Sequence, residues 1–249
     1  MKGSKMAGER SAVTRKKARY VCEVRYHPVS DVLDMRGRTL ARMKDAFSPA
    51  LQNWRVASVA VNLVDDLEAP AREIFVDHQL ARLIMEDPKS TDEFREASSK
   101  MLDRLWTLFG SWLTAIGRIG VRSITVHDAP GCASFEDVRA KVMRTWMAST
   151  MPVDLNVTDL AVTLNHETGR IMVGPVRTGE DWAKAMFTRP GENMPAYGLG
   201  VDVDSSATEV AVSRAKDLLK AFDAVLRLTL MTEQDIVKAC LETGAVEAK

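Results

Sequence analysis

The sequence has few cysteines, no long apolar run and no excess of either charge. Its three cysteines, Cys22, Cys132 and Cys240, lie far apart and form no CxxC pair, which argues against a disulfide framework or a structural zinc site. No apolar run approaches the ~18–20 residues of a membrane span, and the N-terminus lacks the apolar region of a signal peptide. We therefore expect a cytoplasmic protein with no membrane contact.

Charge is balanced over the chain as a whole but not at its start. Lys and Arg number 34, as do Asp and Glu, so no global field favours nucleic acid or an anionic membrane. Residues 1–19 carry seven cations against the single carboxylate of Glu9. This pattern predicts a flexible basic arm, which either contacts nucleic-acid phosphates or keeps the protein soluble.

Alternating and helical patterns follow one another in a repeated order. Residues 20–27 alternate as a half-buried strand, and helical spacing follows in residues 28–47. Two further strands precede a long helix that Ser90 is expected to cap. The second half repeats strand, helix and hairpin, then adds a short helix and a strand before another long helix, with Ser206 as its expected cap. We predict an α+β fold, with an antiparallel sheet covered on one face by helices.

The repeated order predicts two similar lobes, residues 20–117 and 118–230, followed by a short terminal helix and tail in 231–249. An offset of 100 residues, which places Val21 on Val121, supports an internal duplication.

The segment 117–127, GRIGVRSITVH, lies between the first long helix and the second half. A phosphate-binding loop places its glycines after a strand and before a helix, where amide groups converge on the anion. This segment is expected to run from helix to strand. Gly117 is therefore predicted to end the helix, and the segment to be a joint between lobes.

Several of these motifs resemble those of a sporadically distributed family of uncharacterised bacterial proteins of similar size. The shared features are an opening strand of the type EVRY, a central strand with Arg118, Gly120 and Arg122, and a final segment like MTEQDIVKA. The resemblance covers most of residues 20–240 and implies no catalytic residues. The basic arm departs from the family pattern.

Common catalytic signatures are absent: the sequence contains no GxxxxGK[ST], HExxH or GxSxG motif. The strongest local group is HDAPGC, which holds His127, Asp128 and Cys132. A Cys–His pair there would activate a thiolate. The alternative is a turn at Pro130 and Gly131 with Cys132 as a small buried residue.

Polar residues on the predicted strands supply the candidate binding residues: Arg25, His27, Arg118, Arg122, Asp202 and Asp204. The three arginines either form an anion site or pair across strands with Glu23. Two aspartates give too few oxygen ligands for a hard cation. His27 and His127 occupy similar strand ends and are candidates to meet across a pseudo-twofold axis.

We expect no metal and no cofactor. The leading hypothesis is a non-enzymatic binding or assembly protein that contacts a protein partner, or a second copy, through the sheet face or a groove between lobes. The first alternative is a nucleic-acid-associated protein that uses the basic arm. The second is an enzyme that uses His127 and Cys132.

Overall fold

A computed structural model describes residues 13–111, 113, 115–146, 161–166 and 168–242. These residues form an α+β fold with a nine-stranded antiparallel sheet, which confirms the predicted class. The strands are β1 (Arg15–Tyr26), β2 (Asn53–Val56), β3 (Ala60–Val64), β4 (Arg72–Asp77), β5 (Leu80–Glu86), β6 (Ala115–His127), β7 (Val162–His166), β8 (Gly169–Arg177) and β9 (Tyr197–Ala211). The helices are α1 (Asp31–Asp34), α2 (Arg36–Phe47), α3 (Thr91–Phe109), α4 (Phe135–Trp146), α5 (Asp181–Met186), α6 (Ala215–Val237) and the π-helical η1 (Lys238–Glu242).

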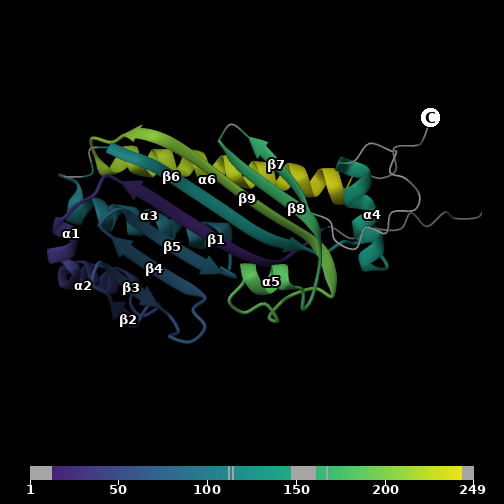
Figure 1. The fold of residues 1–249 in the computed structure, drawn as a ribbon, viewed down its shortest axis with the longest axis horizontal. Coiled ribbons are helices and arrows are strands. Elements are labelled where there is room, and N and C mark those ends of the chain that lie inside the picture. Colours follow the sequence, from purple (N-terminus) through teal and green to yellow (C-terminus); the bar gives the residue numbers. More distant parts are fainter. Residues whose placement is uncertain (1–12, 112, 114, 147–160, 167, 243–249) are drawn as a thin grey trace, which may run out of the picture.

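The strand order is β2-β3-β4-β5-β1-β6-β9-β8-β7. The first strands of the two halves, β1 and β6, therefore pair at the centre of the sheet, and the other strands of each half extend outward from this pair (Figure 1). The arrangement is one continuous sheet. The equivalence of the halves as two similar lobes stays a prediction.

Side chains alternate between two faces of the sheet because successive residues of a strand point in opposite directions. On β1, Tyr20, Cys22 and Val24 are fully buried in a core shared with α2, α3 and α6. We call this face the helix side. The opposite face, which carries Arg19 and Glu23 of the same strand, is the open side (Figure 1).

The two long helices lie across the helix side. The Ser90 side chain accepts a hydrogen bond from the Glu93 amide at 3.2 Å, which confirms the predicted cap of α3. Phe94 of α3 stacks on Tyr20 with ring centroids 5.1 Å apart and meets Phe222 of α6 edge-on at 6.3 Å. These ring contacts join both helices to the central strand.

The segment 117–127 lies within β6, so the prediction of a joint was wrong. The helix α3 ends at Phe109 with Gly110 as its cap residue. Gly117 lies instead near a shift in the register between β1 and β6, where Arg25 pairs with Arg118 but Tyr26 pairs with Ile116. A Cβ atom at Gly117 would make only an ordinary contact with the Arg25 carbonyl, 3.7 Å away, so the structure gives no steric reason for glycine at this position.

The offset of 100 residues was also wrong. In the sheet Val21 pairs with Arg122, and Cys22 pairs with Val121. Val21 therefore faces the open side, whereas Val121 faces the helix side. Residues related by a twofold axis through the sheet face the same side, so any internal alignment of β1 with β6 needs an odd offset.

Several predicted boundaries move in the structure. Arg15 to Arg19 belong to β1, so the proposed arm cannot extend to residue 19; residues 1–12 lie outside the described part of the chain. The lobe boundary at 117/118 falls inside β6, and the boundary at 230/231 falls inside α6.

The start of α6 also differs from the prediction. Ser206 lies in β9, and the helix begins at Ala215. There the Asp217 carboxylate accepts hydrogen bonds from the Ser213 amide and hydroxyl, at 3.2 and 2.8 Å. The Ser206 pattern matched the sequence signature of a helix cap but continues as strand.

Candidate functional site

The open side carries a hollow of about 310 Å³ across the central strands. Strands β5, β1 and β6 form its floor, and the end of α5 borders it. We call it the open-side hollow. Its polar lining residues are Arg19, Glu23, Arg25, Arg82, Arg118, Arg122 and Asp204.

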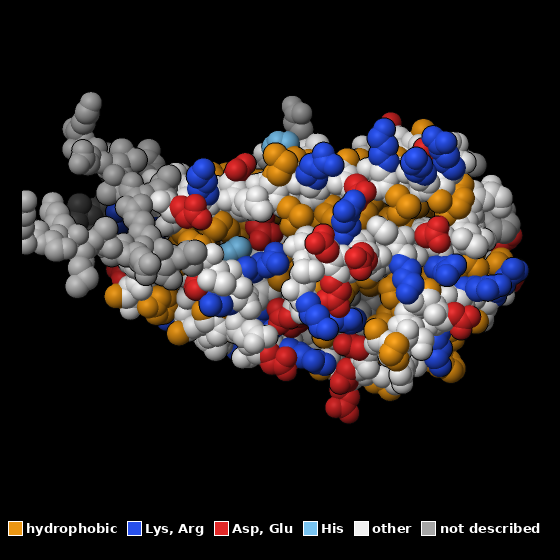
Figure 2. Space-filling model, turned by 180° about the vertical axis from the view of Figure 1, so that it is seen from behind, with side chains coloured by type: hydrophobic (Ala, Val, Ile, Leu, Met, Phe, Trp, Pro, Cys, Tyr) orange, Lys and Arg blue, Asp and Glu red, His pale blue; other side chains and the backbone are white. Residues whose placement is uncertain are grey.

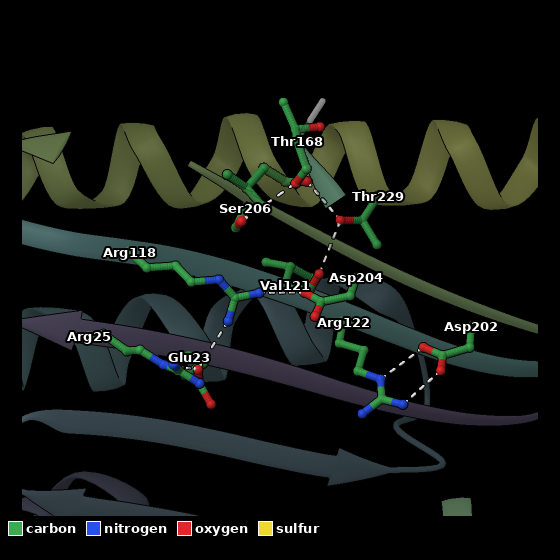
Figure 3. Close-up of polar contacts among 11 residues, drawn as sticks. Glu23, Arg25, Arg118, Val121, Arg122, Thr168, Asp202, Asp204, Ser206 and Thr229 are labelled. Atoms are coloured by element: carbon green, nitrogen blue, oxygen red, sulfur yellow. Dashed lines mark hydrogen bonds and ion pairs between the residues drawn. The ribbon is translucent and has the colours of Figure 1, made fainter. Parts of the chain in front are cut away.

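Arg118 lies along the sheet surface and joins three strands (Figure 3). Its guanidinium donates to Glu23 of β1 at 3.1 Å and to Asp204 of β9 at 2.7 Å. A Cβ atom at Gly120 would lie 3.1 Å from the guanidinium carbon of Arg118. Glycine at this position therefore leaves room for the arginine to lie flat between its two carboxylate partners.

Arg122 makes a two-point contact with Asp202 of β9. Its Nε and a terminal nitrogen donate to the two carboxylate oxygens at 2.8 and 2.7 Å (Figure 3). These hydrogen bonds raise the pKa of Arg122 above its ordinary value, although burial opposes the shift. Planar guanidinium and carboxylate groups match in this geometry.

Two further arginines on the open side also have carboxylate partners. Arg25 Nε donates to Glu23 at 2.7 Å, and the Arg25 side chain is largely exposed. Arg82 lies 3.5 Å from Glu73 of β4 and over the ring of Phe75. Its Nε is buried and has no hydrogen-bond partner among the described residues.

Arg19 is the exception in the open-side hollow. Its guanidinium donates to the Met186 carbonyl at 2.8 Å, and within the described ranges no carboxylate oxygen lies within 4.0 Å of it. Burial lowers the pKa of Arg19, although Glu86 and Glu73 oppose the shift from farther away. A half-buried cation without a direct anionic partner is therefore present in the hollow.

The segment beyond α5 is fastened to the sheet by a buried ion pair. Lys17 Nζ lies 3.1 Å from Glu86, and both side chains are almost completely buried. Glu86 also accepts hydrogen bonds from the amides of Thr188 and Arg189 at 2.7 and 2.9 Å. The pair thereby holds the chain that presents the Met186 carbonyl to Arg19.

The structure brings together five of the residues predicted from sequence: Arg25, Arg118, Arg122, Asp202 and Asp204. The predicted pairing across strands with Glu23 is confirmed for Arg118. It was wrong for Arg122, which pairs with Asp202, and for Arg25, which contacts Glu23 within the same strand. The aspartates serve as partners of Arg118 and Arg122, which the sequence interpretation missed. Arg19 and Arg82 were missed too.

The two histidines do not meet. His27 is exposed just after the end of β1, whereas His127 ends β6 and pairs with Arg15 at the start of β1. Because β1 and β6 are antiparallel, the two side chains lie at opposite ends of the central strand pair. The hypothesis of a shared site across a pseudo-twofold axis was wrong.

His127 lies buried on the helix side against Glu233 of α6. Its Nε2 is 3.2 Å from Glu233 Oε1 and 3.1 Å from Thr125 Oγ1, and the Ser123 hydroxyl donates to Glu233 at 2.6 Å. Burial alone would raise the pKa of Glu233, but the hydrogen bonds from His127 and Ser123 outweigh it and lower the pKa. Glu233 had no sequence signal of its own, since it lies far from β6 in the chain.

Asp128 and Cys132 have other neighbours. The Asp128 carboxylate accepts from the Thr14 amide at 2.6 Å and lies 3.3 Å from Lys16 Nζ. Cys132 packs beside a core cluster around α4, and its carbonyl accepts from the Tyr197 hydroxyl at 3.1 Å. The predicted group of His127, Asp128 and Cys132 therefore does not assemble around the imidazole, which instead contacts Thr125 and Glu233.

No protein-family model matches the chain, and no curated protein sequence is significantly similar to it. None of the helices in the described ranges is both long and apolar enough to cross a membrane. In the same ranges, His, Cys, Asp and Glu side chains form no group of three or more suited to hold a metal ion.

Proposed function

We propose that this chain is a non-enzymatic binding protein that recognises a segment of a protein partner in the open-side hollow. The observation that carries the proposal is Arg19, which is partly buried in the hollow and, within the described part of the chain, bonds only to a backbone carbonyl. A carboxylate from the partner supplies the anion that Arg19 lacks. Arg82, whose guanidinium lies over the Phe75 ring, adds a second positive charge to the same hollow.

The charge pattern favours a protein segment of mixed charge over nucleic acid. Five arginines line the hollow, but Glu23 and Asp204 lie among them, and 40% of the Asp204 side chain is exposed. A phosphodiester backbone would bring uniform negative charge against these carboxylates. A protein segment can place a basic side chain against Asp204 and an acidic one against Arg19.

The other two hypotheses find less support. The basic arm falls largely outside the described residues, and its described end is part of β1. The imidazole of His127 bonds to Glu233 and Thr125. The open-side hollow is therefore the better-supported binding site.

The test is a fluorescence anisotropy titration with a labelled peptide of about ten residues in which Glu and Lys alternate. We expect saturable binding that the Arg19→Gln variant weakens about tenfold, which corresponds to one charge-assisted hydrogen bond. Arg227→Gln removes an exposed arginine from the helix side and should leave binding unchanged. Tighter binding of a labelled oligothymidylate, or equal peptide affinity in Arg19→Gln and the unmodified protein, would contradict the proposal.

A further inference from the structure

A second group of arginines lies on the helix side, between α2 and α3. Arg38 and Arg42 of α2 and Arg104 of α3 line a hollow of about 150 Å³, together with Thr107 and Leu108. We call these three residues the arginine cluster. It is separate from the open-side hollow, with which it shares no lining residue.

Helix geometry explains why the three side chains line the same hollow. Arg38 and Arg42 are one turn apart on α2, so they project from the same side of that helix. Their neighbours Thr39 and Met43 are buried, as are Met101 and Leu105 of α3. The packing of these apolar faces brings Arg104 up to the α2 pair.

The arginine cluster has no counterion among the residues that the structure describes. Throughout the described ranges, no Asp or Glu oxygen lies within 4.0 Å of a side-chain nitrogen of Arg38, Arg42 or Arg104. The described residues that line the hollow include no carboxylate either. Three like charges in one hollow repel one another, so an external anion stabilises this arrangement.

Further positive charge lies beside the cluster. Lys100, one turn before Arg104 on α3, places its ammonium 5.3 Å from the ring centroid of Phe47. Figure 2 shows the helix side, where basic side chains gather at the end opposite the grey residues. The local potential at this end of the helix layer therefore favours an anion.

We propose that the arginine cluster binds a phosphate group, either as free inorganic phosphate or as the terminal group of a small phosphomonoester. Guanidinium groups present paired donors that match the oxygens of phosphate. The Thr107 hydroxyl donates to the Asp103 carbonyl at 2.9 Å, so the donors to the ligand are guanidinium groups. The hollow is smaller than the ~300–1,000 Å³ of most small-molecule sites, which fits one phosphate group and not a whole nucleotide.

The experiment is isothermal titration of the full chain with inorganic phosphate, repeated with glycerol 3-phosphate and with sulfate. We expect one saturable site, weakened about tenfold or more by Arg104→Gln, since each charge-assisted hydrogen bond is worth at least that factor. Arg42→Lys keeps the positive charge but loses the paired N–H donors of the guanidinium group, so it should also weaken phosphate binding. Lys44→Gln removes an exposed cation from the same helix and should have no effect.

The arms of the experiment separate the two sources of the phosphate group. Tighter binding of glycerol 3-phosphate assigns the site to a phosphomonoester, and equal or weaker binding assigns it to the free ion. The proposal is overturned by the absence of saturable binding up to about 10 mM phosphate, tenfold above a weak Kd of ~1 mM. The proposal is also overturned if Lys44→Gln and Arg104→Gln weaken phosphate binding to the same extent. Circular dichroism melts of each variant show whether a loss of binding reflects unfolding.

Discussion

Four of the five arginines that line the open-side hollow pair with a carboxylate of the sheet, whereas none of the three arginines of the arginine cluster does so among the described residues. On the open side Arg118 and Arg122 each bond to a carboxylate of β9, and Arg25 bonds to Glu23. In the arginine cluster between α2 and α3, the three arginines line one hollow without a carboxylate among the described lining residues. Paired charges hold strands in register, whereas unpaired charges of one sign attract an external ion.

The largest expected effect comes from breaking the most deeply buried pair. Lys17→Met leaves the Glu86 carboxylate, whose side chain is only 2% exposed, without its cation. We expect unfolding in urea to show a loss of about 3–5 kcal/mol, as is typical when one partner of a buried pair is removed. The matched control is Lys16→Met, because Lys16 pairs with Asp128 at an exposed position and should contribute less than about 1 kcal/mol. Equal effects of the two variants would contradict the structural role of Lys17.

The paired carboxylate on the helix side predicts a pH dependence. The pKa of Glu233 is lowered from its ordinary 4.5, so its stabilising contribution is present above that value and is lost as pH falls through the lowered pKa. Glu233→Gln should therefore lower stability by about 1.5–3 kcal/mol at neutral pH, the value of a charge-assisted hydrogen bond. Thermal melts between about pH 3 and 7 should show that the difference in melting temperature between the unmodified protein and Glu233→Gln narrows on acidification. If the difference in stability between the two proteins grew as pH fell, the pKa of Glu233 would not be lowered in the folded state.

A smaller effect is expected from the pairs that are open to water. Because 39% of the Arg122 side chain is exposed, its bond to Asp202 is partly screened by solvent. A double-mutant cycle with Arg122→Gln and Asp202→Asn should give a coupling energy of about 1 kcal/mol. Purely additive effects would show that this pair does not stabilise the fold.

The smallest expected effect has the opposite sign to the others, because removing an arginine of the unpaired cluster should stabilise the protein. Arg38→Gln removes a like-charge neighbour one turn from Arg42, so it should stabilise the protein by about 0.2–0.5 kcal/mol at low salt. Salt screens the repulsion, and the gain should vanish near ~1 M NaCl. A destabilising effect in phosphate-free buffer would mean that Arg38 has an internal partner.

The sequence predicted well the features that depend on local pattern. Alternation identified β1 and β9, and the Ser90 motif located the start of α3. Alternation also placed Asp202 and Asp204 on the polar face of their strand. These features follow from periods of two or 3.6 residues, which neighbouring residues alone determine.

What the sequence could not predict depends on strand order and register. One of the two strands expected before the first long helix covered residues 55–64, which form the β2–β3 hairpin in the structure, because the turn near Ser58 carries neither glycine nor proline. Lys17 looked like part of a flexible arm, because its partner Glu86 lies on a strand far along the chain. The pairing of Arg122 with Asp202 likewise required knowing that β6 and β9 are neighbours.

The most direct test of the contrast between paired and unpaired arginines is an NMR titration that resolves the arginine Nε–Hε signals. Single Arg→Lys variants assign the signals, and inorganic phosphate is added to the full chain at constant ionic strength. The account predicts that the signals of Arg38, Arg42 and Arg104 move together and saturate, while those of Arg118 and Arg122 stay in place because their carboxylates already occupy them. The account would be contradicted if the signals of Arg118 and Arg122 moved while those of Arg38, Arg42 and Arg104 stayed unchanged.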